Sequence, residues 1–121
     1  MKKLIVAASM ATVALGLSTG AQAANAISTE ELMSYCKSTE SSSFVTCEIY
    51  GQAVYDTYLV TRHPKYAPNT ICVKQPAQPR KEVIQEYVAW SDANPTQAKV
   101  PAAETILRFL ASKYPCGKAA K

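Results

Sequence analysis

Four stretches of the chain repeat their apolar side chains at spacings of three and four residues, the period of one face of an α-helix. The first helix is predicted over residues 29–36, where Ser28 and Glu31 form a capping box at its start. The other three helices are predicted over residues 44–61, 79–93 and 101–114. No segment alternates apolar and polar residues long enough to predict a strand, so the expected fold class is all-α, a small four-helix domain.

Polar and proline-rich segments separate these helices. Residues 62–79 hold four of the seven prolines, which end regular structure after the second helix. Gly51 lies inside the second helix, where glycine costs about 1 kcal/mol of helix propensity relative to alanine. It is either a tolerated residue or the mark of a close crossing with another helix. On the second interpretation, Gly51→Leu would destabilise the fold by overpacking.

The amino terminus resembles a secretory signal peptide. Lys2 and Lys3 precede an apolar stretch of 14 residues, and Ala21 and Ala23 offer the small side chains of a cleavage site. A membrane-spanning helix needs about 20 apolar residues, so this stretch is too short for one. We expect cleavage after residue 23 or residue 26. Residues 1–23 are then a signal peptide and residues 24–121 a single mature domain in the bacterial periplasm, with no membrane contact once the signal is removed.

The charge of the mature chain argues against nucleic-acid binding. Removal of Lys2 and Lys3 leaves 11 basic and 9 acidic side chains, a net charge of +2. The basic residues are scattered along the sequence, whereas nucleic-acid-binding proteins usually cluster them on one face. We therefore expect no nucleic-acid partner and an ordinary solvated surface.

Four cysteines in a mature chain of 98 residues predict two disulfides, because the periplasm is oxidising and small exported domains often need covalent staples. Three pairings are possible. Cys36 ends the first predicted helix and Cys47 begins the second, so both lie at one end of that hairpin. Cys72 leaves the far end of the second helix, and the last two helices return Cys116 to that end. The predicted pairs are Cys36–Cys47 and Cys72–Cys116.

The sequence offers little for metal binding or catalysis. It has no C-x-x-C spacing, and its single histidine, His63, lies beside a proline in a predicted loop. With every cysteine paired, no Cys–His or Ser–His nucleophile is indicated. Glu48 and Asp56 share one helix but lie two turns apart, which is typical of a solvated face. We expect no catalytic residue, no metal and no cofactor.

Several residues in a fixed order resemble those of a known family. They are Phe44, Cys47, Tyr50 and Asp56, then Cys72 before a proline-bearing loop, Asn94-Pro95, Pro101-Ala102 and the closing Tyr114-Pro115-Cys116. In this order and spacing the chain resembles the Rap/Tai immunity proteins, which protect bacteria from type VI secretion peptidoglycan amidases. The resemblance implies a small periplasmic helical protein, often a homodimer, that binds an imported amidase and blocks its active-site groove.

Such an inhibitor needs a rigid frame and an ordered loop, since preordering lowers the entropic cost of binding. The polar turn at residues 91–99 fits this role. Its candidate contact residues are Asp92, Asn94, Pro95, Thr96 and Gln97. An ordinary helix connection is an equally good interpretation of this turn, and residues 62–78 are the second candidate loop. A periplasmic acid-stress chaperone, or a helical binding protein of another kind, is the alternative function.

Overall fold

The computed structural model describes residues 25–117, and the predicted signal peptide lies outside the described residues. Four α-helices and one 3-10 turn follow one another in this part of the chain, which contains no β-strand. They are α1 (Thr29–Cys36), α2 (Ser41–Val60), α3 (Arg80–Ala93), η1 (Pro95–Gln97) and α4 (Ala102–Lys113). The all-α prediction is confirmed. Within residues 25–117, no helix combines the length and apolarity needed to cross a bilayer.

The predicted helix boundaries are close to those observed, except at the start of α2. The cap of α1 is as expected, with the Ser28 hydroxyl accepting a hydrogen bond from the Glu31 amide. The serines before Phe44, expected in a loop, instead form the first turn of α2. The Glu40 carboxylate accepts hydrogen bonds from the Ser42 and Ser43 hydroxyls at 2.9 and 3.5 Å. These bonds hold the turn together although serine is not a strong helix former.

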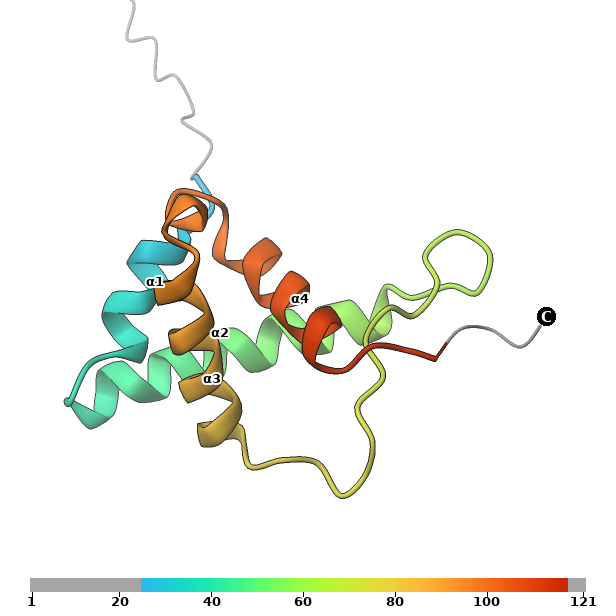
Figure 1. The fold of residues 1–121 in the computed structure, drawn as a ribbon, viewed down its shortest axis with the longest axis horizontal. Helices are drawn as coiled ribbons and strands as arrows, with labels where there is room; N and C mark the ends of the chain where they lie inside the picture. Colours follow the sequence, from blue (N-terminus) through green and yellow to red (C-terminus); the bar gives the residue numbers. More distant parts are fainter. Residues whose placement is uncertain (1–24, 118–121) are drawn as a thin grey trace, which may run out of the picture.

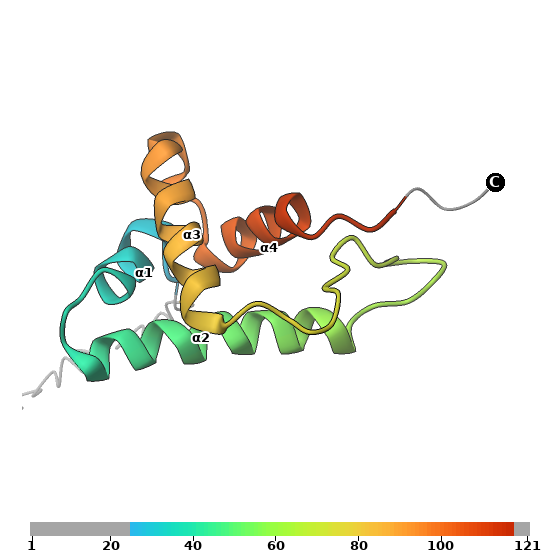
Figure 2. The same cartoon turned by 60° about the horizontal axis from the view of Figure 1, so that its bottom comes forward.

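Helix α2 is the longest element, and the other three helices lie on one side of it (Figures 1 and 2). The predicted disulfide pairing assumes antiparallel neighbouring helices, in which α3 would run back alongside α2. Both views show instead that α3 crosses α2 steeply. The segment between Cys72 and Arg80 carries the chain back from the end of α2, so that α3 begins against the middle of that helix (Figure 2).

The hydrophobic core lies between α1, α3 and α4. Its buried residues are Leu32, Met33, Cys36, Cys47, Ile84, Tyr87, Ala102, Ile106 and Phe109. Tyr87, Trp90 and Phe109 form an aromatic cluster with ring centroids 5.5 to 6.2 Å apart, a favourable separation for such rings. Among these buried residues only Cys47 comes from α2, whereas Phe44, Tyr50 and Val54 of α2 pack against the core partly buried.

Both predicted disulfides are present and leave no free cysteine among residues 25–117. Cys36–Cys47 closes a short loop, with a sequence separation of 11, and joins α1 to α2. Cys72–Cys116 spans 44 residues and joins the segment after α2 to the end of the chain. In the chain-entropy model, loops of these lengths stabilise the fold by about 3 and 4 kcal/mol. The cysteine beyond α4 therefore anchors the last helix.

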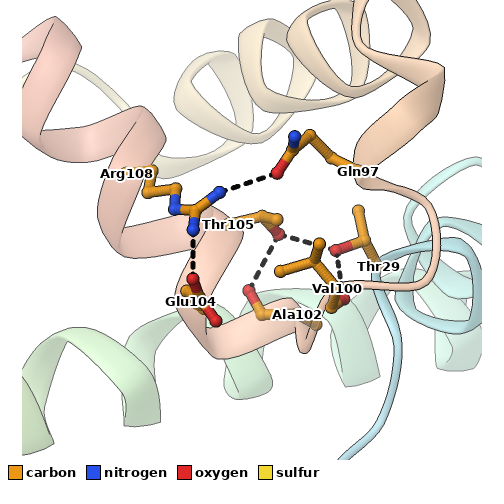
Figure 3. A network of polar contacts seen from close by, with 7 residues as sticks. All are labelled: Thr29, Gln97, Val100, Ala102, Glu104, Thr105 and Arg108. Atoms are coloured by element: carbon orange, nitrogen blue, oxygen red, sulfur yellow. Dashed lines mark hydrogen bonds and ion pairs between the residues drawn. The ribbon is translucent and has the colours of Figure 1, made fainter.

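A chain of buried hydroxyl groups connects α1, α3 and α4, and Figure 3 shows its part between Thr29 and Thr105. The Thr29 hydroxyl donates to the Val100 carbonyl oxygen at 2.8 Å. Each hydroxyl has one hydrogen, so Thr105 shares its hydrogen between the Thr29 hydroxyl oxygen at 2.8 Å and the Ala102 carbonyl oxygen at 3.1 Å. The Tyr87 hydroxyl, 2.7 Å from that of Thr105, must then donate to it. Thr29 and Thr105 are fully buried, so each bond replaces one that water would otherwise make.

The buried hydroxyl chain predicts that Thr105→Val is destabilising despite its matched shape. The substitution leaves the Tyr87 hydroxyl without an acceptor and the Thr29 hydroxyl without a donor, both away from water. We expect the free energy of unfolding to fall by about 1–3 kcal/mol in denaturant titrations followed by circular dichroism. Thr57→Val is the matched control, because the exposed Thr57 hydroxyl bonds only to its own helix. An equal effect of both variants would contradict a special role for the buried chain.

The ion pair between Glu86 of α3 and Lys113 of α4 predicts a pH dependence. Hydrogen bonds from Lys113 and then Gln78 lower the pKa of the Glu86 carboxyl below its ordinary value. A lowered folded-state pKa means that the pair stabilises the fold above the unfolded-state pKa, and that this contribution is lost as the pH falls through the folded-state pKa. In thermal melts across that acidic range, the melting temperature of Glu86→Gln should fall less steeply with decreasing pH than that of the parent. Parallel curves would show that Glu86 contributes nothing.

Candidate functional site

The five predicted contact residues lie together in the turn between α3 and α4. Helix α3 ends at Ala93, and η1 then reverses the chain. Backbone bonds hold the turn: the amides of Gln97 and Ala98 donate to the carbonyl oxygens of Asn94 and Pro95 at 2.9 and 3.2 Å. The turn is also attached to α1, because the Glu30 amide donates to the Ala98 carbonyl oxygen at 3.0 Å. It is an ordered structure, not a flexible linker.

Three of these five side chains already have partners within the protein. The Asn94 amide group donates to the Trp90 carbonyl oxygen at 2.7 Å and so caps α3. Gln97 accepts a hydrogen bond from Arg108 of α4 at 2.8 Å (Figure 3). Asp92 pairs with Lys37, just after α1. Sequence reasoning could not identify these anchors, because Arg108 and Lys37 lie 11 and 55 residues from their partners.

Pro95 and Thr96 are exposed. They lie where the end of α3 projects from the rest of the protein (Figure 2). The turn therefore presents two exposed side chains on a backbone that its hydrogen bonds hold in place. Asp92 of the exposed Asp92–Lys37 ion pair precedes Pro95 by three residues.

Residues 62–78, the second candidate loop, divide into two parts. The first is a compact turn that projects beyond the end of α2 (Figure 1). The amides of His63 and Ala67 each donate to the other residue's carbonyl oxygen at 2.9 Å. The second part returns along the helices and carries Cys72. His63 is exposed in the first part, as the sequence analysis expected.

Tyr58 is a key residue of this region that the sequence analysis did not single out. It is buried near the end of α2, and its hydroxyl accepts hydrogen bonds from the amides of Thr70 and Ile71 at 2.7 and 2.9 Å. Burial opposes ionisation, but these bonds and the nearby Arg62 guanidinium bring the pKa of the Tyr58 phenol below its ordinary value. The sequence signal for Tyr58 is its position on the apolar face of the second predicted helix, which predicts its burial but not these hydrogen bonds.

A largely apolar cleft of about 350 Å³ lies between α2, α3, α4 and the segment before α3. Gly51 lines it from α2. A side chain added at Gly51 would meet no heavy atom within 4 Å beyond its own helix. The interpretation of Gly51 as a close helix crossing is therefore wrong, because α3 and α4 pack to either side of the cleft and not onto the glycine.

The structure does not bring acidic groups together into a recognisable catalytic site. Glu48 lies along the cleft, whereas the Asp56 carboxylate is exposed and accepts a hydrogen bond from Gln52 at 2.7 Å. Within residues 25–117 no group of three or more histidine, cysteine or acidic side chains could hold a metal ion. The ordered turns, and not a reactive cluster, are the features that stand out.

Residues 28–116 match the family model of the Rap1a immunity proteins. The chain belongs to this family. The match spans all four helices and both disulfides, so it covers the whole described fold. The resemblance to the Rap/Tai immunity proteins is thereby confirmed. No curated protein and no solved structure gives a significant match to the chain.

Membership of the Rap1a immunity family makes this chain an immunity protein against a secreted effector. Such a protein acts by binding its effector, so the family assigns it a protein partner and a non-enzymatic role. The turns at residues 91–99 and 62–67 are ordered and accessible, and both are candidates for this contact.

The open space above Gly51 predicts that Gly51→Ala stabilises the protein. Alanine is the better helix former by about 1 kcal/mol, and its methyl group meets no neighbour outside the helix. We expect the midpoint of denaturant unfolding to rise, with no change in the dependence on denaturant concentration. An exposed alanine of the same helix, Ala53, gives the matched control, since Ala53→Gly should lower the midpoint by a similar amount. A lower midpoint for Gly51→Ala would contradict the open cleft.

Proposed function

We propose that the mature protein is a periplasmic inhibitor of a type VI secretion peptidoglycan amidase, and that residues 91–99 enter the active-site groove of that enzyme. The amidase as target comes from the resemblance to the Rap/Tai immunity proteins, and family membership supports it. A homodimer, the second implication of the resemblance, is part of the same proposal. It would double the mass measured by light scattering on the mature protein.

The observation that carries this proposal is the fixed backbone of the turn. Its bonds to α1 and α4 order it before any partner arrives, so binding loses little conformational entropy. Pro95 adds to this stiffness by restricting its own backbone angle. Thr96 and Pro95 are then free to contact the partner without breaking an internal bond.

The proposed compartment is supported by two independent features. The amino terminus has the pattern of a secretory signal, and all four cysteines are paired. Disulfides of this kind persist in oxidising compartments and are rare in the cytosol. A periplasmic inhibitor would meet a peptidoglycan amidase where that enzyme acts.

The test is titration calorimetry of the mature protein against a peptidoglycan amidase found beside its gene or recovered with it from periplasm, together with an assay of amidase inhibition. Thr96→Arg adds bulk and charge at an exposed side chain without removing an internal bond. We expect it to weaken binding at least about tenfold, or roughly 1.4 kcal/mol. Pro95→Gly should weaken binding less, by loosening the turn. Gln85→Arg is the matched control, because Gln85 is exposed on α3, the helix that leads into the turn. It should bind like the parent.

Two further variants locate the contact. The exchange Lys37→Asp with Asp92→Lys retains an ion pair but reverses the charges presented to the partner, so it tests whether the partner reads the charges of this pair. Tyr66→Arg tests the second loop. Full affinity in Thr96→Arg, with loss in Tyr66→Arg, would move the site to residues 62–78. Absence of binding to the amidase by the parent would refute the proposed target.

A further inference from the structure

One segment of the mature chain has basic residues but no acidic ones. Residues 57–81 contain no aspartate or glutamate. The basic residues in this segment are Arg62, Lys65, Lys74, Arg80 and Lys81. Five of the 11 basic side chains of the mature chain thus lie in 25 consecutive residues without an acidic neighbour in sequence. Two of them, Arg62 and Lys65, belong to the turn that projects beyond α2 (Figure 1).

Large apolar side chains are exposed at the same place. Val60 is 83 % exposed, Tyr66 76 % and Leu59 49 %. Val45 and Ile49, near the other end of α2, are the two remaining large exposed apolar residues within residues 25–117. We call residues 59–67 the basic tip, because they combine three exposed apolar side chains with two cationic ones. The tip joins two kinds of groups that a soluble surface normally keeps apart.

The basic tip has a defined shape. Besides the paired bonds of His63 and Ala67, the Nδ1 atom of His63 accepts hydrogen bonds from the amides of Lys65 and Tyr66 at 3.1 and 3.4 Å. The His63 and Tyr66 rings stack with centroids 4.9 Å apart. At its base, the Arg62 guanidinium lies 4.3 Å from the centroid of the Tyr58 ring. The turn therefore has an ordered backbone, on which Lys65 and Tyr66 are exposed.

We propose that the basic tip docks on an anionic lipid surface, contrary to the expectation from the sequence that the mature chain makes no membrane contact. Val60 and Leu59 supply apolar groups for the boundary of the acyl chains, and Tyr66 suits the headgroup layer, where amphipathic aromatic rings are favoured. Lys65 and Arg62 complement the phosphates of anionic lipids. Such a contact is peripheral and reversible, in line with the absence of a spanning helix within residues 25–117.

A fluid lipid surface fits the tip better than the complementary surface of a protein does. The apolar side chains come from two elements, the end of α2 and the turn beyond it, and stand on a projection instead of lining a cleft. A lipid interface adapts to such a shape. This contact is separate from the turn proposed for amidase binding, so one tip can hold the protein at a membrane while the other turn faces the effector.

The test is sedimentation of the mature protein with sucrose-loaded vesicles, either of phosphatidylcholine alone or of phosphatidylcholine with phosphatidylglycerol. We expect binding to the anionic vesicles only, and its loss at high salt. Lys65→Ala should reduce the partition coefficient about fivefold, the usual contribution of one basic residue near an anionic surface. The pair Val60→Ser and Tyr66→Ser should reduce it further. Val45→Ser with Ile49→Ser is the matched control, since it removes two exposed apolar side chains far from the tip along α2.

Equal sedimentation with both vesicle types, or none with either, would overturn the proposal. So would an equal loss in the control pair, because binding would then reflect general hydrophobicity. If the tip variants bind lipid like the parent but weaken the amidase complex, the tip is a protein-docking surface and the lipid proposal fails. Because the vesicle assay contains no amidase, its result does not depend on whether the proposed amidase inhibition is correct.

Discussion

Helix α2 is fastened to the rest of the protein at its two ends, and most other features depend on this. Of its 20 residues only Cys47 and Tyr58 are buried. Cys47 joins it to α1 by a disulfide, and the Tyr58 hydroxyl binds the backbone that leads to Cys72. Phe44, Tyr50 and Val54 pack against the core but are only partly buried. Covalent and hydrogen-bonded attachments supplement this limited burial, and the outer face of α2, the cleft above Gly51 and the basic tip remain open.

Much of the frame could be predicted from the sequence because its signals are local. The capping box at Ser28, the helical spacing of apolar residues and the prolines determine the elements one by one. The disulfide pairing followed from which ends of the helices carry cysteines. The start of α2 was misjudged because Glu40 binds two serine hydroxyls that otherwise favour a loop. The steep crossing of α3 depends on the path of residues 72–79, which no periodicity describes.

Features that join distant parts of the chain could not be predicted. Thr29 and Thr105 are 76 residues apart, and nothing in the neighbourhood of either indicates that their hydroxyls meet. For the same reason the turn at residues 91–99 was recognisable as polar and proline-stiffened, whereas the anchoring of Gln97 by Arg108 was not. Gly51 is a similar case, because a glycine in a helix leaves space at its surface and the sequence does not show whether another helix fills that space. Similarly, the acid-free segment is visible in the sequence, but the exposure of Val60 and Tyr66 is not.

The central claim is that this immunity protein meets its effector through an ordered turn attached to the core. Hydrogen–deuterium exchange of the mature protein, with and without the proposed amidase partner, tests it most directly. The account predicts added protection in peptides covering residues 91–99, with little change over residues 59–67, because the first turn enters the enzyme and the second stays free. Protection confined to residues 59–67, or spread evenly over all four helices, would contradict the account.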